Sequence, residues 1–430
     1  MTVVAGVLCA AAATATATTA CSSTEDAPVA APADAAIEAG PFATADHPVL
    51  PQVVGGKGPM LRSPKVVPIF FPGFGYRTEV VGLAETLGAS SYWSATTSEY
   101  GVGPLTSAPA VDVKETPARA VRNSEIRAWL VSRFDGTHPE FGTQPLPEAI
   151  YSLYYPATTT VELDAIGDGP DAGAAGATNP RTCVDVAGYH DDVLIGGQAV
   201  AYAVMVACDG DGLSGTTDEL VTGLSSHEWV EASTDPLVRT NPATLGIDGD
   251  HSIWAVALGG GELADLCENA GQLVTSTFVP GVEYSVQRSW SNAAARASQD
   301  PCVPARADAA YFNTVAVLPD TVILQGFPTM GITVHPGETK SIDLVLFSTA
   351  PTDPWTVTVT PFEIGPAGGF LAMSDVDVDV AVGPSSTGVN GDKLTLTIHK
   401  SPSAVPRIRG FLVTSTLALA SQRWFGAIGD

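Results

Sequence analysis

The sequence predicts an α/β (α+β) domain over residues 48–305, followed by an all-β sandwich over residues 306–430. Three observations lead to this division. As far as Cys302, strand-like apolar runs alternate with helical segments, which is typical of an α/β core. Beyond Cys302, only short strand-like segments separated by Pro and Gly turns are found. A chain of 430 residues is also long enough for two or three domains with well-buried cores.

The elements of the first domain follow from their apolar patterns and their turn residues. Short runs rich in Val, Ile and aromatic residues predict buried strands. Segments with apolar residues at helical spacing predict helices, and Asn123 or Ser124 is the expected cap of one of them. The expected strands cover residues 65–71, 149–155 and 198–207, and the expected helices cover residues 79–87, 124–134 and 218–233.

The second domain is predicted from alternation. Segments such as WTVTVTPFEI and DKLTLTIHK alternate apolar and polar residues, as strands with one buried face do. Roughly 120 residues of this kind suit an immunoglobulin-like sandwich. This part of the sequence offers no catalytic constellation, and we expect His335 and His399 on strand or turn surfaces.

The N-terminus predicts export. Residues 1–21 are apolar and rich in small residues, as in a bacterial signal peptide, and residues 22–47 have the composition of a disordered linker. The sequence TTAC that ends at Cys21 resembles a lipobox, the site at which bacterial lipoproteins are cleaved and acylated. We therefore expect an outer-membrane lipoprotein of the bacterial cell envelope that is lipidated at Cys21. Simple secretion to the extracellular space is the alternative.

The remaining cysteines predict disulfides. Four cysteines follow the signal region, and an even number in an exported protein is typical of two disulfide bonds. Three pairings can be drawn. We expect the local one, which joins Cys183 to Cys208 and Cys267 to Cys302.

The net charge of the chain argues against some classes of binding partner. Asp and Glu number 46 against 20 Lys and Arg, and the formal net charge is −26. Such a charge repels nucleic acid and anionic membrane surfaces. We expect no nucleic-acid partner, and contact with a membrane only through the N-terminal lipid anchor.

The helix expected over residues 218–233 carries the sequence HEWVE, an HExxE pattern. His227 and Glu231 are four residues apart and share one helix face, and their burial without partners would be costly. A metal ion bound by both residues would remove this cost. Glu228 would then act as general base on a metal-bound water. For the motif taken alone, a salt-bridged helix is at least as good an interpretation.

A further ligand has to come from outside this helix. The segment GELADLCE places Glu262 and Asp265 three residues apart, on one face if it is helical, and Cys267 would anchor it through a disulfide. His190 and His251 are lesser candidates. Two carboxylates and one histidine suit zinc, and they also make calcium or manganese plausible.

These motifs also occur in a recognisable order. SHEWVEASTDP, GELADLC and VQRSWSN, with YWSATTSEYGVG and AYAVMVAC upstream, resemble the plant exordium (phosphate-induced protein) family and related exported bacterial proteins. The resemblance covers residues 48–303 and implies a core similar to that of metzincin-like zinc peptidases, hence zincin-like. Glu231 stands where a zincin has its second histidine, and Asp235, followed by a proline, is expected to end the helix and brace the site. The residues at matching positions are His227, Glu228, Glu231, Asp235, Glu262, Asp265 and Cys267.

Together these features predict a lipid-anchored, metallopeptidase-like protein that hydrolyses peptide bonds with metal-activated water. Zinc is the expected cofactor, with another divalent cation as the alternative, and a peptide or protein is the expected substrate. The competing prediction is a non-catalytic cell-surface protein with a degenerate peptidase fold that binds protein or glycan. A serine hydrolase is disfavoured because the sequence GLSS lacks the G-x-S-x-G elbow.

Overall fold

The part of the chain that can be described begins at residue 42. The computed structural model describes residues 42–163, 179–208, 216–258, 260–267, 281–324, 326–364, 378–383, 385–404 and 409–430, and the backbone of 273–274 and 370–372. The predicted signal peptide, Cys21 and the linker up to residue 41 lie outside these residues. Residues 42–47, assigned to the linker from sequence, contact the folded unit: the Ala45 N–H donates to Asn390 Oδ1 at 3.0 Å, and His47 stacks on Phe347.

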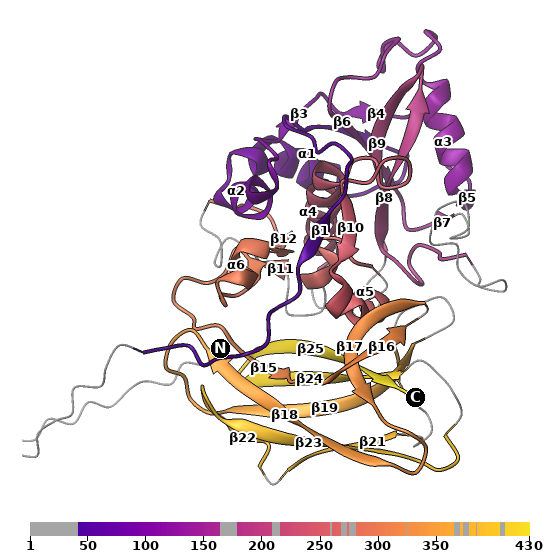
Figure 1. The fold of residues 1–430 in the computed structure, drawn as a ribbon. Helices are drawn as coiled ribbons and strands as arrows, with labels where there is room; N and C mark the ends of the chain where they lie inside the picture. Colours follow the sequence, from indigo (N-terminus) through magenta and orange to yellow (C-terminus); the bar gives the residue numbers. More distant parts are fainter. Residues whose placement is uncertain are drawn as a thin grey trace, which may run out of the picture. The chain divides into compact units, whose positions relative to one another are not determined.

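The protein is a mixed α+β structure in which strands predominate (Figure 1). Its first half is built on a six-stranded sheet with the order β3-β2-β6-β9-β8, in which β4 also pairs with β2. The central strands run parallel, and β8 pairs antiparallel with β9 at the edge. The predicted apolar strands are confirmed as β2, β6 and β9. The strands are β2 (Lys65–Phe70), β3 (Thr106–Ser107), β4 (Val111–Asp112), β6 (Ala149–Tyr155), β8 (Gly188–Ile195) and β9 (Gln198–Val206).

Helices pack on both faces of this sheet, because successive strand residues point to opposite sides. Ile150 and Tyr154 of β6 share a core with α1, α2 and α4, whereas Tyr151 and Leu153 share a second core with α3. The motif helix α4 therefore lies on the side of α1 and α2. The helices are α1 (Arg77–Thr86), α2 (Ser91–Thr97), α3 (Asn123–Ser132), α4 (Thr217–Thr234), α5 (Ser252–Leu258) and α6 (Asn292–Arg296).

The cap of α3 differs from the expectation. The helix begins at Asn123, and the N-cap position belongs to Arg122, whose N–H donates to Glu125 Oε2 at 2.8 Å. The Asn123 side chain is used elsewhere: its Nδ2 donates to Asp191 Oδ2 at 2.9 Å. Asn123, which local capping rules favour as the N-cap, thus belongs to a buried polar network instead.

Short strands complete the first half of the chain. They form two-stranded pairs that fix loops around the large sheet. The pairs are β1 (Val53–Gly55) with β10 (Thr244–Ile247), β5 (Ala120–Arg122) with β7 (Thr160–Glu162), β11 (Leu273–Val274) with β12 (Val286–Gln287), and β13 (Ser289–Trp290) with β14 (Cys302–Val303).

The second half is a β-sandwich, as predicted. One sheet has the order β15-β18-β23-β21, and the other has the order β16-β17-β25-β24-β19-β20, with β22 pairing β19. Both sheets contribute side chains to one hydrophobic core. His335 and His399 are exposed, as expected. The strands are β15 (Phe312–Ala316), β16 (Asp320–Leu324), β17 (Phe327–Thr333), β18 (Thr339–Ser348), β19 (Trp355–Ile364), β20 (Phe370–Ala372), β21 (Val378–Gly383), β22 (Thr387–Gly388), β23 (Lys393–Lys400), β24 (Arg409–Leu417) and β25 (Ala420–Gly429).

The core of the sandwich continues into the first half of the chain. Trp254 of α5 packs edge-on against Trp424 and Phe425 of β25, with ring centroids 5.6 and 5.1 Å apart. Residues 42–430 form one compact unit. One hydrophobic core therefore contains residues from both sides of the predicted boundary between residues 305 and 306.

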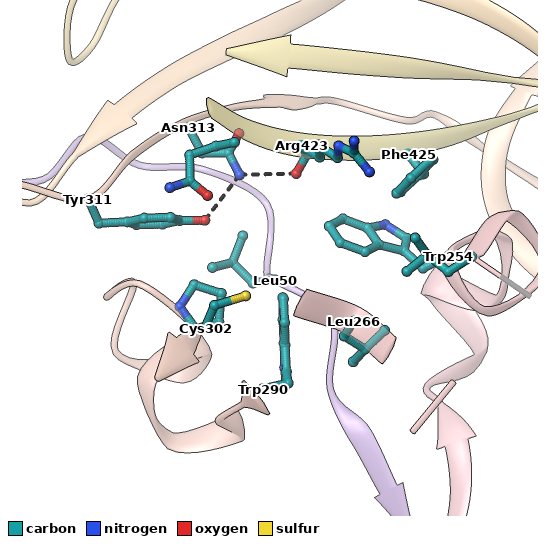
Figure 2. A pocket seen from close by; sticks show the side chains of 12 residues that line it. Leu50, Trp254, Leu266, Trp290, Cys302, Tyr311, Asn313, Arg423 and Phe425 are labelled. Atoms are coloured by element: carbon teal, nitrogen blue, oxygen red, sulfur yellow. Dashed lines mark hydrogen bonds between the residues drawn. The ribbon is translucent and has the colours of Figure 1, made fainter. Parts of the chain in front are cut away.

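A pocket lies where these parts meet (Figure 2). Most of its lining is apolar or aromatic, and Asn313 Nδ2 donates to Tyr311 OH at 3.0 Å and to Arg423 O at 3.3 Å. Its lining includes no residue of the HExxE motif.

Both predicted disulfides are confirmed. Cys183 bonds to Cys208 and Cys267 bonds to Cys302, with Cα–Cα distances of 5.3 and 5.7 Å. Two disulfides indicate an exported protein. In the part of the chain that the structure describes, no helix has both the length and the apolar character needed to cross a bilayer.

The Asp248 carboxylate ties together three groups beside the shared core. It accepts the Gln52 N–H at 2.7 Å and the Asp250 N–H at 3.1 Å, and it faces His251 Nδ1 at 2.7 Å. His251 also packs edge-on against Trp424. His251, a lesser candidate ligand from sequence, is thus held by these contacts.

We expect the Asp248 contacts to make stability depend on pH. Burial alone would raise the pKa of Asp248, but His251 and the two N–H groups lower it below its ordinary value. A lowered pKa in the folded state stabilises the protein above about pH 4, and this contribution is lost as pH falls through the folded-state pKa. Asp248→Asn should lower the free energy of unfolding at pH 7 by about 1–3 kcal/mol. The deficit should shrink at acid pH.

Denaturant unfolding followed by tryptophan fluorescence, repeated between acid and neutral pH, measures this deficit. Asp250 lies two residues away and is exposed, so Asp250→Asn is the matched control. An equal deficit at all pH values would show that the ionised carboxylate is not the stabilising group.

Candidate functional site

The motif helix α4 is buried around its whole circumference over its last turns. It starts with a capping box, in which the Thr216 N–H donates to Glu219 Oε2 at 2.8 Å. Every residue of 225–234 is buried. The sequence suggested a single inward face, but the protein also covers the remaining sides. The ionisable side chains of the motif therefore lie in the interior and need partners there.

Glu231 joins this helix to the GELADLC segment. Its Oε1 accepts the N–H groups of Ala264 and Asp265 at 2.9 and 3.2 Å. Its Oε2 lies 3.0 Å from His227 Nε2, which is also 3.6 Å from Asp265 Oδ1. The structure thus brings side-chain atoms of His227, Glu231 and Asp265 within 4.8 Å of one another.

His190 of the edge strand β8 enters the same cluster. Its Nδ1 lies 3.7 Å from Glu228 Oε2 and 3.8 Å from Glu231 Oε2, and its Nε2 lies 3.5 Å from Glu262 Oε1. These distances are too long for hydrogen bonds. They are close to the separation of about 3.3–3.4 Å between ligand atoms that surround one tetrahedral cation. His190 was a lesser candidate from sequence, but in the structure it lies between Glu228, Glu231 and Glu262.

Asp235 holds the loop that follows the helix. Helix α4 ends at Thr234, and the Asp235 carboxylate accepts the Ala243 N–H at 2.6 Å and the Thr244 hydroxyl at 2.9 Å. The main-chain oxygen of Asp235 lies 3.2 Å from His190 Nε2. Asp235 therefore contacts the cluster through its main-chain oxygen, which helps to hold the His190 ring in place.

Gln287 of the VQRSWSN segment links the motifs to one another, and sequence reasoning missed it. Its N–H donates to Ser226 Oγ at 2.8 Å and its Nε2 donates to Ala264 O at 3.0 Å. Its carbonyl oxygen accepts the hydroxyl of Tyr92, from the YWSATT segment, at 2.5 Å. The order of the motifs was the available signal, since the VQRSWSN, GELADLC and YWSATT segments meet beside α4.

Gly188 sets the spacing between β8 and α4. A Cβ at this position would lie 2.8 Å from Val204 O, and 3.1 Å from both Glu228 Oε1 and Leu224 Cδ1. Only a residue without a side chain lets the helix approach so closely. The same approach brings His190, two residues further along β8, to the motif.

The electrostatics of the cluster are dominated by carboxylates. Burial alone would lower the pKa of both histidines, but Glu262 and its neighbours raise that of His190, and Glu231 and its neighbours raise that of His227, in both cases well above the ordinary value. Burial raises the pKa of Glu262 well above its usual range. Burial would also raise the pKa of Glu231, but His227 outweighs it and lowers that pKa.

Several atoms of the cluster are buried without a hydrogen bond. They are Glu228 Oε2, Glu262 Oε1 and His227 Nδ1. Buried polar atoms normally have partners, and an excess of carboxylates over imidazoles needs positive charge. Nitrogen and carboxylate oxygen donors at these spacings fit a divalent transition-metal ion.

Comparisons with known proteins do not show a family. No family model matches the sequence, and no curated protein matches it. Similar solved structures include the titin M3 domain, with 11% identity over 23% of this chain and 85% of that chain, at a TM-score of 0.16. A PapD-like domain of human CEP192 has 15% identity over 28% of this chain and 84% of that chain, at 0.19. A family 123 glycoside hydrolase from Clostridium perfringens has 12% identity over 27% of each chain, at 0.17. Such low TM-scores carry no argument.

We expect Gly188→Ala to disturb the site. The added methyl group would lie 2.8 Å from the backbone oxygen of Val204 in β9 and 3.1 Å from Glu228 Oε1 and Leu224 Cδ1 in α4. The backbone of β8 therefore has to shift relative to β9, and α4 has little room to stay in place. Overpacking of this kind costs about 1–3 kcal/mol of unfolding free energy. Thermal and denaturant unfolding measure the loss. Gly75→Ala is the matched control, because nothing lies within 4 Å of a Cβ there. Equal stability of the two variants would contradict the close approach.

Proposed function

We propose that the protein is an exported metal-dependent hydrolase of the peptidase class. Its core would be zincin-like, its sandwich immunoglobulin-like, and its anchor a lipid on Cys21. One observation carries the proposal: a strand, a helix and the GELADLC segment bring two imidazoles and an excess of carboxylates into a buried cluster. His227, Glu231 and Asp265 would hold the cation, and zinc fits their nitrogen and oxygen donors.

The cation, when bound, supplies Lewis acidity and lowers the pKa of a water molecule to about 7. The protein's own residues supply the remaining functions. Glu228, next to the ligands in sequence, has its carboxylate inside the cluster and is suited to accept a proton. The two N–H groups on Glu231 Oε1 fix the orientation of that carboxylate.

The exposure of the cluster indicates where a substrate would enter. The side chains of His227 and Glu228 are 6% and 3% exposed. Those of Asp265 and Glu262 are 21% and 25% exposed. The cluster therefore opens on the side of the GELADLC segment, and a peptide carbonyl would approach from there.

A non-catalytic binding protein is the second candidate. Hydrogen bonds hold the GELADLC segment to Glu231, and the Cys267–Cys302 disulfide anchors it. Structural metal sites are closed and held in this way. In this case the cation would only stabilise the fold, and the sandwich would bind protein or glycan.

We expect the purified protein to retain a divalent transition metal through dialysis. His227→Ala should remove about one equivalent, because a site of three protein ligands rarely survives the loss of one. Elemental mass spectrometry measures bound metal per chain. His399→Ala replaces an exposed histidine of β23 and should retain the full content. A wild-type protein that holds no metal, even after incubation with zinc or manganese, would contradict the proposal.

We expect Glu228→Gln to abolish hydrolysis while the cation at His227, Glu231 and Asp265 stays bound. Loss of a general base costs about 10²–10⁴-fold in rate. Cleavage of casein and of a peptide library by the two proteins, with the metal content of each determined, tests this. Activity that is equal in the two proteins would contradict the role of Glu228. No cleavage by either would favour the binding protein.

A further inference from the structure

The cluster contains two sets of ligand atoms. His227, Glu231 and Asp265 form one set, and His190, Glu228 and Glu231 form the other, each with its atoms within 4.8 Å of one another. Glu231 belongs to both. We propose that the second set binds a second divalent transition-metal ion, so that the protein holds a two-cation centre bridged by Glu231. This inference rests on the proposed function, because it adds a cation to the same site.

The surroundings of His190 leave one of its nitrogens for a cation. Nε2 lies 3.2 Å from Asp235 O and 3.5 Å from Glu262 Oε1, two acceptors that favour a proton on this nitrogen. Nδ1 then carries the lone pair and points at Glu228 and Glu231. A histidine that donates one N–H to a carbonyl or carboxylate while the other nitrogen binds a metal is the usual arrangement of metal-ligating histidines.

Glu228 supplies an independent observation. The residue is 2% exposed, and its Oε2 has no hydrogen bond. This same oxygen is the one that lies 3.7 Å from His190 Nδ1. An ionised carboxylate oxygen buried without a hydrogen bond is costly. A cation between Glu228 and His190 would provide the missing partner.

The hydrogen bonds of Glu231 explain how one residue serves both sets. Its Oε1 is occupied by the N–H groups of Ala264 and Asp265. Its Oε2 faces both histidines, at 3.0 Å from His227 Nε2 and 3.8 Å from His190 Nδ1. This single oxygen is therefore the bridge. Hydrolases with two metal ions use such pairs to stabilise both the attacking and the leaving oxygen.

Metal titration tests the proposal. The full-length protein is stripped with a chelator and titrated with Mn²⁺, with calorimetry and elemental analysis as readouts. Wild type and His399→Ala should bind about two ions per chain, and His190→Ala and His227→Ala about one each, since each removes a ligand from one set. Glu231→Gln should bind neither ion tightly. Electron paramagnetic resonance should show magnetically coupled Mn²⁺ ions in the wild type and an isolated ion in His190→Ala.

The variant Glu228→Gln distinguishes a Glu228 that ligates the second cation from a Glu228 that acts only as a general base. As a ligand, Glu228 is needed for the second ion, so the variant should bind about one ion. If Glu228 were only a base, the variant would bind as many ions as the wild type. Circular dichroism checks that each variant folds, and His190→Gln replaces His190→Ala if the latter does not.

Three results would overturn the inference. They are a wild type that saturates at about one ion, unchanged stoichiometry in His190→Ala, and unchanged stoichiometry in Glu228→Gln. A single ion that depends on His227 would leave the proposed hydrolase intact. A wild type that binds no ion would contradict the proposed function as well.

Discussion

The carboxylate of Glu231 is the interaction on which the site depends. One of its oxygens accepts two backbone N–H groups and so fixes the GELADLC segment against the motif helix. The other oxygen faces the two histidines that come from α4 and β8. A histidine at this position could not accept two N–H groups and also face two imidazoles, because each of its ring nitrogens offers at most one lone pair. A glutamate at this position therefore allows an arrangement that a histidine would not allow.

The rest of the protein packs around the cluster and holds its helix in place. Helix α4 is packed against the large sheet on one side, where Trp229 Nε1 donates to Ser152 Oγ, and against the segment around Gln287 on another. The Cys267–Cys302 disulfide ties the GELADLC segment to the chain just before the sandwich. Buried charges are tolerated only where their partners are held in place, and the surrounding packing provides this.

The sandwich is more than an appended domain. Trp254 and Trp290 belong to the same hydrophobic cluster as Trp424 and Phe425. The GELADLC segment also reaches this cluster, through Leu266 and Cys267. Packing of the sandwich can therefore influence the segment that carries Asp265 and Glu262, whichever of the two candidate functions holds.

The sequence by itself determined the features that depend on near neighbours along the chain. The helical pattern of α4, the apolar runs of β2, β6 and β9, and the expectation of local disulfide pairing can all be read from short stretches of sequence. Spacing alone also put His227 and Glu231 on one face. The sequence could not rank His190 above His251, because both are single histidines in short polar segments.

Only the tertiary structure decided that ranking. The register of β8 on β9 pairs His190 with Ala203, and Gly188 lets α4 come close enough for His190 to meet Glu228 and Glu231. Register and helix approach result from packing between segments distant in the chain, and local propensity carries no information about either. The same reason explains why Gln287 and the continuous core across residue 305 emerge only from the folded chain.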